Sequence, residues 1–429
     1  MIPPDLVGVC GRMVVMKKDL VAADPHKNRT GQSSLLLYAV MGHVVIAGSN
    51  HALFIVFARK LDPETFVAFS TAVGLHILAW VIADGGVSYV APRELATVAN
   101  RRGGVMAGAF LTLRTGLYVV ATVGGFLLWN LLAEDALSGI WVAAYAAYAL
   151  PSLLIPYWLT CWSMDVVGLL ATVAVRVIIL GAAVLAPVPA MLGFSGLGFL
   201  GFVFWLMMWL NRRETIVGWA GFRVLRIAVQ KLSEVFLAKT VACVMYGLAP
   251  LIIGVSRGAF MASDYVTGER IYRVYMALFQ PVVQIVYLSQ FQEGPLKQNK
   301  GILGTSVHLT NVLLGVAVLL AVQAGALSIM GERFEAVVGV RVYLLAACLA
   351  VASGAMLYFR VFPSGDFGIF RRATVFQTTA FAVMLSLVLV RPDVPVAWIL
   401  GIAEAALFVA LVGELVVRRF LRLRENSEA

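Results

Sequence analysis

The sequence predicts an all-α integral membrane protein with about twelve transmembrane helices, arranged in two six-helix lobes around a central cavity. Three observations predict this fold. The 429 residues are 61% hydrophobic and only 13% charged, with a mean hydropathy of +0.90, whereas a soluble domain carries roughly 25% charged residues. Apolar runs of roughly 20 residues, enough to cross a bilayer, recur along the whole chain. The longest connection between them is basic and lies near the middle, and it divides the runs into two sets of six, as in many transporters.

This composition disfavours several classes of protein. So few charged side chains cannot cover the surface of a soluble enzyme or a nucleic-acid-binding domain of this length. The basic excess, 33 Lys and Arg against 23 Asp and Glu, does not cluster on one soluble element, so we expect no nucleic-acid partner. The four cysteines lie far apart without a C-x-x-C pair, which indicates packing thiols and predicts no metal site.

The motifs of common catalytic sites are absent from the sequence. It lacks the G-x-x-x-x-G-K-[ST] loop of ATP-hydrolysing proteins, the G-x-S-x-G turn of serine hydrolases and the H-E-x-x-H helix of zinc proteases. We therefore expect no catalytic residue and no cofactor. A membrane-embedded glycan transferase or ligase remains an alternative, but such an enzyme needs a large outer loop, and the outer loops predicted here are short.

Twelve apolar runs are interpreted as membrane spans. Pro151 and Pro156 interrupt the fourth, which is the least regular. The predicted spans are 34–58, 65–91, 104–129, 139–161, 166–187, 193–210, 233–256, 265–290, 303–330, 337–359, 373–390 and 396–417.

The distribution of basic residues predicts the orientation in the membrane. With a cytoplasmic N-terminus, 22 of the 33 Lys and Arg fall in cytoplasmic segments and six in outer ones, which favours both termini in the cytoplasm. The predicted segments are a cytoplasmic N-terminal segment (1–32), a first six-helix lobe (33–210), a linker (211–232), a second six-helix lobe (233–418) and a cytoplasmic tail (419–429).

The linker and the lobes carry further patterns. Arg223, Arg226 and Gln230 recur at helical spacing with apolar residues around them, so the linker is predicted to be an amphipathic helix on the cytoplasmic interface. The connection after the first span contains Arg59 and then F-V-A-F-S, and the connection after the seventh contains Arg257 and then F-M-A-S. This faint similarity supports two related lobes.

Ionisable side chains at membrane depth are costly and often functional. Arg114 and Arg176 each lie about ten residues into an apolar run, near the middle of the bilayer. Arg270 and Arg273 are three residues apart and share a helix face, and Lys239 lies about two turns into its span. The acidic residues at similar depth are Asp84, Glu269 and Glu404, so the buried excess is positive.

These charges have a functional and a structural interpretation. In the functional one, Arg114, Arg176, Lys239, Arg270 and Arg273 line a water-filled cavity and bind an anionic substrate, with Asp84 and Glu269 as supporting ion-pair partners. Phosphate or pyrophosphate suits arginine because the guanidinium fork pairs with it bidentately. In the structural one, the charges pair with one another, for example Asp84 with Arg114 or Glu269 with Arg273. The polar G-S-N-H patch at 48–51 is predicted to make hydrogen bonds between helices.

Several of these segments resemble one family, the polysaccharide (O-antigen type) flippases of the multidrug/oligosaccharidyl-lipid/polysaccharide exporter superfamily. D-G-G at 84–86 followed by R-E-L-A at 93–96 is similar to that family's D-x-G … R-E-[hydrophobic]-A stretch. G-E-R-I at 268–271 is similar to its A-E-R-[hydrophobic] segment, with Gly268 in place of the usual alanine. Arg114 and Arg176 resemble the family's basic positions in the third and fifth helices.

The resemblance covers roughly 34–420 and implies a function. Members move a polyprenyl-pyrophosphate-linked oligosaccharide from the cytoplasmic to the outer leaflet of the cell inner (plasma) membrane. It implies a lipid-linked glycan substrate, contact with membrane lipids, and functional association with a polysaccharide polymerase and glycosyltransferases. A drug or small-cation exporter of the same superfamily is the main alternative, but its cavity should be lined with carboxylates and aromatic residues, whereas the buried excess here is basic.

Overall fold

The computed structural model describes residues 28–61, 63–97, 100–132, 166–186, 221–290, 300–325 and 337–428. Every regular element in these ranges is helical. In chain order they are α2 (Asn28–Lys60), α3 (Pro63–Asp84), α4 (Val87–Thr97), α5 (Asn100–Leu132), α8 (Val166–Leu185), α10 (Phe222–Arg257), α11 (Ala259–Ser289), α13 (Lys300–Gln323), α15 (Val340–Met356), the π-helical turn η2 (Leu357–Val361), α16 (Phe362–Ser364), α17 (Phe367–Val390) and α18 (Ala397–Glu428).

The helices agree with ten of the predicted spans, while the fourth and sixth spans (139–161 and 193–210) lie outside the described residues. Seven described stretches are long and apolar enough to cross a membrane. They are Val73–Leu95, Val105–Leu127, Val235–Arg257, Thr305–Gln323, Val340–Ser364, Phe367–Val390 and Ala397–Leu421. The chain is therefore a multi-pass membrane protein, as its composition predicts.

The predicted second span is broken into two helices. The backbone turns at Gly85 (φ 49°) and Gly86 (φ 90°), and both conformations disfavour any residue with a Cβ. The two glycines also let the chain pack closely on α10, because a Cβ at Gly85 would lie 2.8 Å from the Phe236 ring and one at Gly86 2.6 Å from Val235 Cγ1. The predicted span at 65–91 therefore contains a break, which hydropathy does not register because it carries no information on backbone direction.

The turn between the seventh and eighth spans is shorter than predicted. Gly258, with φ 88°, is the whole connection between α10 and α11, and its N–H donates to the Gly254 carbonyl at 3.0 Å. Helix α11 consequently begins at Ala259 and not at 265. The polar residues at the start of this span are therefore part of the helix.

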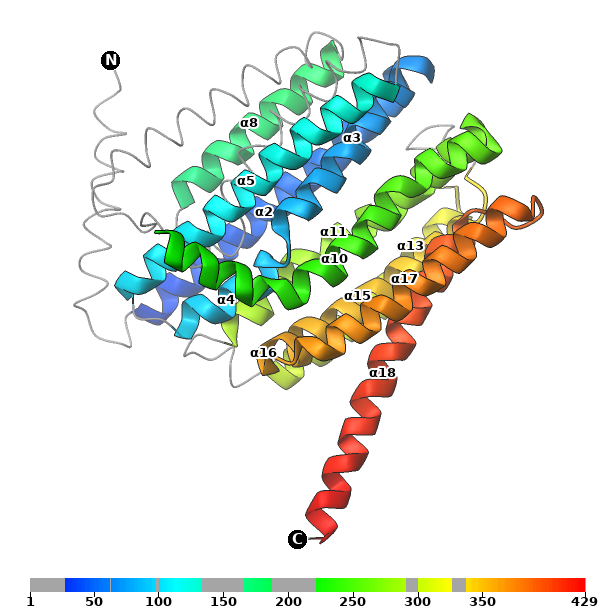
Figure 1. Cartoon of the computed structure of the whole chain (residues 1–429). Helices are drawn as coiled ribbons and strands as arrows, with labels where there is room; N and C mark the ends of the chain where they lie inside the picture. Colours follow the sequence, from blue (N-terminus) through cyan, green and yellow to red (C-terminus); the bar gives the residue numbers. More distant parts are fainter. Residues whose placement is uncertain are drawn as a thin grey trace, which may run out of the picture.

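The two lobes pack in equivalent ways. Helix α2 packs on α8 in the first lobe, and the corresponding α10 packs on α17 in the second. Between the lobes, α2 contacts α11 and α3 contacts α10. The first helix of each lobe thus contacts the second helix of the other lobe. Figure 1 shows the two sets of helices side by side, the first in blue to teal and the second in green to red. This pattern supports two related lobes.

A matching contact closes one end of each lobe. At the end of α2, Lys60 donates to the Val184 carbonyl at the end of α8. At the end of α10, Arg257 donates to the Val388 carbonyl at the end of α17, and to the carbonyls of Arg391 at 3.3 Å and Pro392 at 3.1 Å. Basic side chains here satisfy carbonyl groups that a helix C-terminus leaves unpaired.

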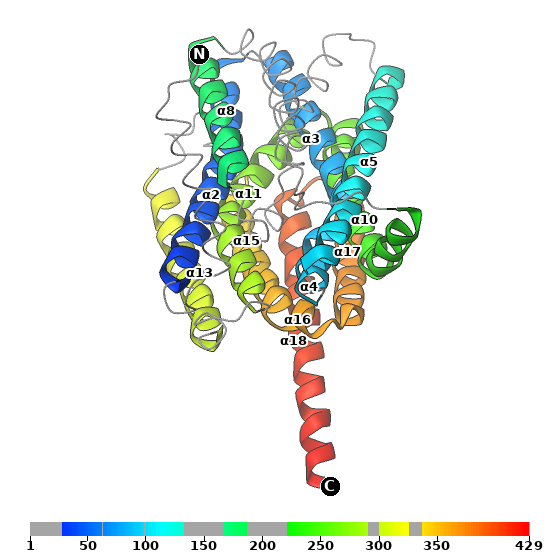
Figure 2. The same cartoon turned by 90° about the vertical axis from the view of Figure 1, so that its left-hand side faces the viewer.

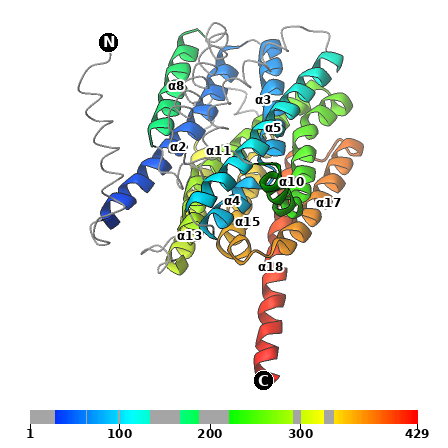
Figure 3. The same ribbon diagram turned by 60° about the vertical axis from the view of Figure 1, so that its left-hand side comes forward.

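The opposite end of the bundle carries α4, α16, the start of α10 and the end of α18 (Figures 1 and 2). We call it the α4 end; by the distribution of basic residues it is the end predicted to face the cytoplasm. Helix α18 extends well beyond the other helices there (Figure 3). In Figure 1 the ribbons of the two lobes come together at the α4 end and lie farther apart at the other.

The predicted linker is continuous with the seventh span. Residues 211–220 are outside the described residues, but α10 begins at Phe222 and runs through 233 without a break. Its first turns lie at the edge of the bundle, at an angle to the rest of the helix (Figure 2). Ala228 and Leu232 are buried, whereas Phe222 and Val229 are exposed. One face of this segment therefore packs on the bundle, and its place on the cytoplasmic interface stays a prediction.

Candidate anion-binding site between the lobes

The predicted site residues come from both lobes. In the first lobe they are Asp84 at the end of α3, Arg114 on α5 and Arg176 on α8; in the second they are Lys239 on α10 and Glu269, Arg270 and Arg273 on α11. Arg114 and Arg176 are each only 2% exposed and Arg270 8%. Such burial of arginine is rare, because the guanidinium loses its hydration. The expectation that these side chains avoid lipid and point into protein therefore agrees with the structure.

One group of charges surrounds Asp84, at the break between α3 and α4. The Asp84 carboxylate accepts a hydrogen bond from Ser88 Oγ at 2.5 Å through Oδ1, and it forms an ion pair with Lys239 through Oδ2. Lys239 Nζ also lies 4.6 Å from the centre of the Tyr89 ring, as a cation–π contact. This ion pair joins the two lobes. The suggested pairing of Asp84 with Arg114 is replaced by the pair with Lys239, 155 residues away in the sequence.

Arg114 lies next to this pair but does not form part of it. Its guanidinium stacks on Trp80, with Cζ 4.8 Å from the ring centre, and it lies within electrostatic reach of Asp84. Its Nε and Nη1 atoms are buried without a hydrogen-bond partner among the described residues. A buried, unsatisfied cationic donor is costly. An anion bound here would satisfy it.

A second group of charges lies around the polar patch of α2. Arg176 Nη1 donates to Asn50 Oδ1 at 2.5 Å, which gives the predicted polar patch a partner on α8. The Arg270 guanidinium lies over the Phe54 ring, with Cζ 4.2 Å from its centre. His51 lies within electrostatic reach of Arg270 and Arg273. These contacts join α2 and α8 of the first lobe to α11 of the second.

Two further interactions organise this second group. Arg273 donates to Glu269 Oε1 from Nη2 at 2.5 Å and from Nε at 3.0 Å, which is the predicted pairing. His76 lies 3.0 Å from the Tyr118 hydroxyl and within electrostatic reach of Arg176 and Arg270. The sequence did not indicate a role for His76 or Tyr118, since a single His in an apolar helix carries no spacing signal.

The charges of the site do not balance. Each of its two carboxylates has a lysine or arginine partner, Asp84 with Lys239 and Glu269 with Arg273. The site residues named above thus comprise five cations, Arg114, Arg176, Lys239, Arg270 and Arg273, and two carboxylates. Arg114 stacks on Trp80, Arg176 donates to Asn50, and Arg270 lies over Phe54. The net positive charge of the site suits an anionic ligand between the lobes.

A buried carboxylate with neutral partners lies in the second lobe. Glu404 on α18 accepts hydrogen bonds from Tyr272 at 3.0 Å, Gln377 at 3.2 Å and Tyr246 at 3.3 Å. Gln377 also donates to the Tyr246 hydroxyl at 2.9 Å. The sequence placed Glu404 at membrane depth but assigned none of these partners, which come from three other helices.

Gly268 on α11 allows a close approach of α15. A Cβ at Gly268 would collide with the ring of Tyr343, a fully buried residue of α15. The aromatic ring occupies the volume that a methyl group would need. Gly268 therefore leaves room for Tyr343 where the resemblance leads us to expect alanine.

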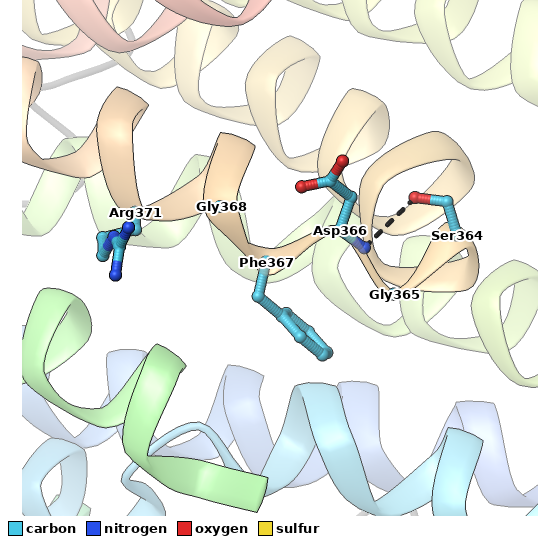
Figure 4. Close-up of a pocket in the computed structure, with 6 residues that line it drawn as sticks. All are labelled: Ser364, Gly365, Asp366, Phe367, Gly368 and Arg371. Atoms are coloured by element: carbon cyan, nitrogen blue, oxygen red, sulfur yellow. Dashed lines mark hydrogen bonds between the residues drawn. The ribbon is translucent and has the colours of Figure 1, made fainter.

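A polar pocket of about 450 Å³ lies apart from this site, at the turn between α16 and α17. The turn begins at Ser364 and Gly365, and Gly365 has a φ of 75°. Figure 4 shows the Asp366 carboxylate and the Phe367 ring on opposite sides of this turn. Burial tends to raise the pKa of Asp366, but the hydrogen bond and charge of Arg418 hold it below its ordinary value. The described residues contain no cluster of three or more side chains that could hold a metal ion.

Comparison with known proteins identifies the fold. No protein-family model matches the sequence, and no curated protein matches it. Solved structures do match over nearly the whole chain. A MOP superfamily transporter from Pyrococcus furiosus, reported with a binding pocket of reverse polarity that suggests a different function, has a TM-score of 0.63 at 15% identity, covering 94% of this chain and 96% of that one.

Two further structures show the same similarity. The eukaryotic MATE transporter AtDTX14 has a TM-score of 0.63 at 12% identity, covering 90% of this chain and 96% of its own. A multidrug resistance MATE family transporter of the MOP superfamily, in an outward-facing conformation, has a TM-score of 0.60 at 14% identity, covering 96% and 98%. The chain therefore has the two-lobed, twelve-helix fold of the MATE transporters.

Proposed function

We propose that this protein is a flippase that moves a polyprenyl-pyrophosphate-linked oligosaccharide from the cytoplasmic to the outer leaflet of the plasma membrane by alternating access. The observation that carries the proposal is the excess of cations over carboxylates between the lobes, above all the buried Nε and Nη1 atoms of Arg114, which have no hydrogen-bond partner among the described residues. A site of this charge repels a cationic cargo and attracts an anionic one.

Pyrophosphate fits the donors that the site offers. Its oxygens accept charge-assisted hydrogen bonds, which are roughly twice as strong as neutral ones. Arg114, Arg176 and Arg270 present planar forks that can bind it bidentately, and Lys239 adds a point charge. In this arrangement the pyrophosphate and the sugars occupy the space between the lobes, and the polyprenyl chain stays in lipid.

The fold supports a transporter. Fold alone does not define a cargo, but proteins with this fold include a multidrug resistance transporter and a transporter with a pocket of reverse polarity. A positive site in a MATE fold is consistent with an anionic cargo. We also propose functional association with a polysaccharide polymerase and glycosyltransferases, which would consume and supply the lipid-linked glycan.

A drug or small-cation exporter is the second candidate. The Glu404 group favours it, since a buried carboxylate surrounded by Tyr246, Tyr272 and Gln377 is the chemistry that binds a cation. A glycan transferase has less support, because among the described residues no outer connection is long enough to host a catalytic loop. The two transporter candidates differ in the charge of the cargo.

Deletion of the gene tests the proposal. The deletion strain should accumulate lipid-linked oligosaccharide in the cytoplasmic leaflet and lose surface glycan, and the wild-type gene should restore both. Arg270→Ala should fail to restore them at normal protein level, whereas Arg391→Ala should succeed, because Arg391 is an exposed arginine outside the site. Normal glycan export in the deletion strain, together with loss of resistance to cationic dyes, would favour the drug exporter instead.

A further inference from the structure

Helix α4 is a short helix joined to α3 by a hinge. It follows Gly85 and Gly86, whose positive φ values allow a change of direction that other residues resist. Its buried face, formed by Val87, Val90 and Leu95, packs with α5 and α10. The helix therefore has its own packing surface and is joined to α3 by two glycines at which the chain changes direction, and hinges are built from such short element-terminal segments.

The other side of α4 contacts the second lobe through aromatic rings. The Tyr89 ring stacks on Phe362, with centres 4.4 Å apart and planes at 23°. It also meets Tyr358 and Phe370 edge-on, at 5.5 Å and 5.8 Å. From α11, the Tyr287 hydroxyl donates to the Tyr89 carbonyl at 2.5 Å. One residue of the first lobe thus sits among four aromatic residues of the second.

The segment that receives Tyr89 is itself irregular. Tyr358 lies in the π-helical turn η2, and Phe362 begins the three-residue helix α16. Next to it, the Arg93 guanidinium packs directly against Gly365, where there is no room for a side chain. π-helical turns are frequent at functional sites and mark places where a helix departs from regular packing. The contact therefore joins two places where a long helix is interrupted, the start of α4 and the η2–α16 segment.

The ion pair at the hinge touches the same contact. Lys239 on α10 pairs with Asp84, directly before the glycines, and its ammonium also lies over the Tyr89 ring, 4.6 Å from the centre. A lysine has three donors and can hold both groups at once. The Lys239 side chain therefore contacts both the residue directly before the two glycines and the Tyr89 ring of α4.

We propose that α4 is a gate that closes the α4 end of the central site, with the Lys239–Asp84 ion pair as its latch. Opening swings α4 about Gly85 and Gly86 and withdraws Tyr89 from Phe362 and its neighbours. The proposal rests on alternating access in the proposed function but not on the identity of the cargo. Lys239 then has two roles, since it belongs both to the latch and to the candidate anion site.

Cross-linking across the gate tests the proposal without any cargo. In a background lacking Cys10, Cys161, Cys243 and Cys348, a pair of cysteines is introduced as Arg93→Cys and Ser364→Cys. Reducible thiosulfonate linkers of graded length then report how closely the lobes approach in native membranes. As a control, Arg372→Cys and Glu414→Cys report a contact between α17 and α18 inside one lobe.

The gate predicts specific changes in these yields. Tyr89→Ala should lower the yield with the shortest linker about tenfold, the effect of losing a buried aromatic contact, whereas Tyr89→Phe should keep it. Asp84→Asn should also lower it, because the latch is lost. The control pair should be unchanged in all three. An undiminished yield in both Tyr89→Ala and Asp84→Asn would overturn the gate.

A second measurement separates the gate from the cargo. Cross-linking Arg93→Cys to Ser364→Cys should stop transport of whatever the protein carries, and reduction of the linker should restore it, while cross-linking the control pair should not. Full transport by the cross-linked protein would overturn the gate. If the yields change as predicted but no lipid-linked glycan is moved, the proposed cargo is wrong and the gate stands.

Discussion

Arg114 and Arg176 are buried to the same degree but have different surroundings. Arg176 shares a hydrogen bond with Asn50, so it ties α8 to α2. Arg114 stacks on Trp80 and has donors without a hydrogen-bond partner among the described residues. A residue that pays a desolvation cost without a matching partner contributes little to stability. At the residue scale, Arg114 is the better candidate for binding and Arg176 for positioning.

This difference predicts opposite effects of removing the two charges. Arg114→Met should abolish most transport while changing the free energy of unfolding by less than about 1 kcal/mol, because replacing a poorly paired buried charge with an apolar side chain is often neutral. Arg176→Met should destabilise the protein by about 1–3 kcal/mol, because Asn50 loses a partner. Thermal unfolding in detergent measures the stability of each variant, and a transport assay measures its activity. A large loss of stability in Arg114→Met with transport intact would contradict this assignment.

Gly268 gives a second prediction at this scale. Gly268→Ala should destabilise the protein by about 1–3 kcal/mol through overpacking against Tyr343. Tyr343→Leu should relieve most of that cost in the double variant, so the two changes should be strongly non-additive in thermal unfolding. Gly116→Ala is the matched control, since nothing lies within 4 Å of its added methyl group. Additive effects would show that the ring does not occupy this volume.

The cations of the site could be predicted from the sequence, and their partners could not. Arg114, Arg176 and Arg270 are conspicuous because arginine is rare inside apolar runs. The pairing of Lys239 with Asp84 depends on how α10 packs against α3, and no spacing in the sequence encodes that contact. For the same reason the pairing of Arg273 with Glu269 was predictable, since both lie on one helix four residues apart.

Basic residues at the ends of helices give a prediction at the scale of elements. Arg257→Ala should cost about 1–2 kcal/mol, because the C-terminus of α17 and the following turn lose their shared donor. Hydrogen exchange at 388–392 should rise together with the loss of thermal stability. Arg59→Ala is the control, since Arg59 is exposed and has the same charge near the same end. Equal effects of the two changes would contradict a role for these carbonyl contacts.

The turn between α16 and α17 predicts a dependence on pH. The lowered pKa of Asp366 means that its ionised form, paired with Arg418, stabilises the fold above the ordinary value of 3.8, and that this contribution is lost as pH falls through the lowered pKa. Wild type should therefore unfold at a higher temperature than Asp366→Asn at about pH 5 to 7. The difference should vanish below the lowered pKa. A constant difference at all pH values would contradict the assignment.

Hydropathy predicted the existence of the elements better than their shape. The apolar runs located the described spans because each needs an apolar surface toward lipid. The break at Gly85 and Gly86 and the π-helical turn at 357–361 occur inside apolar sequence, so hydropathy does not distinguish them from regular helix. Two glycines in succession at 85–86 were the available signal for the first. The signal for the second was Pro363, which lacks a backbone N–H and disturbs the regular hydrogen bonds of the turn before it.

At the scale of the whole molecule, the two lobes have the same helix arrangement but different buried charged residues. Helices α2 and α8 in the first lobe and α10 and α17 in the second meet in the same way. The first pair carries the cation Arg176, whereas the second adjoins the carboxylate Glu404. The lobes are therefore similar in architecture and differ in the charge of the buried groups at these places. The cytoplasmic location of both termini stays a prediction.

The central claim is that the buried cations bind the pyrophosphate during transport. Its most direct test uses purified protein in proteoliposomes that carry a polyprenyl-pyrophosphate-linked oligosaccharide in one leaflet. Wild type and Arg391→Ala should move this lipid to the other leaflet faster than protein-free vesicles do. The double variant Arg114→Ala/Arg270→Ala should fall to the protein-free rate, because its site has lost two of its four arginines. A double variant that moves the lipid as fast as wild type, at equal reconstitution, would contradict a cationic site for the pyrophosphate.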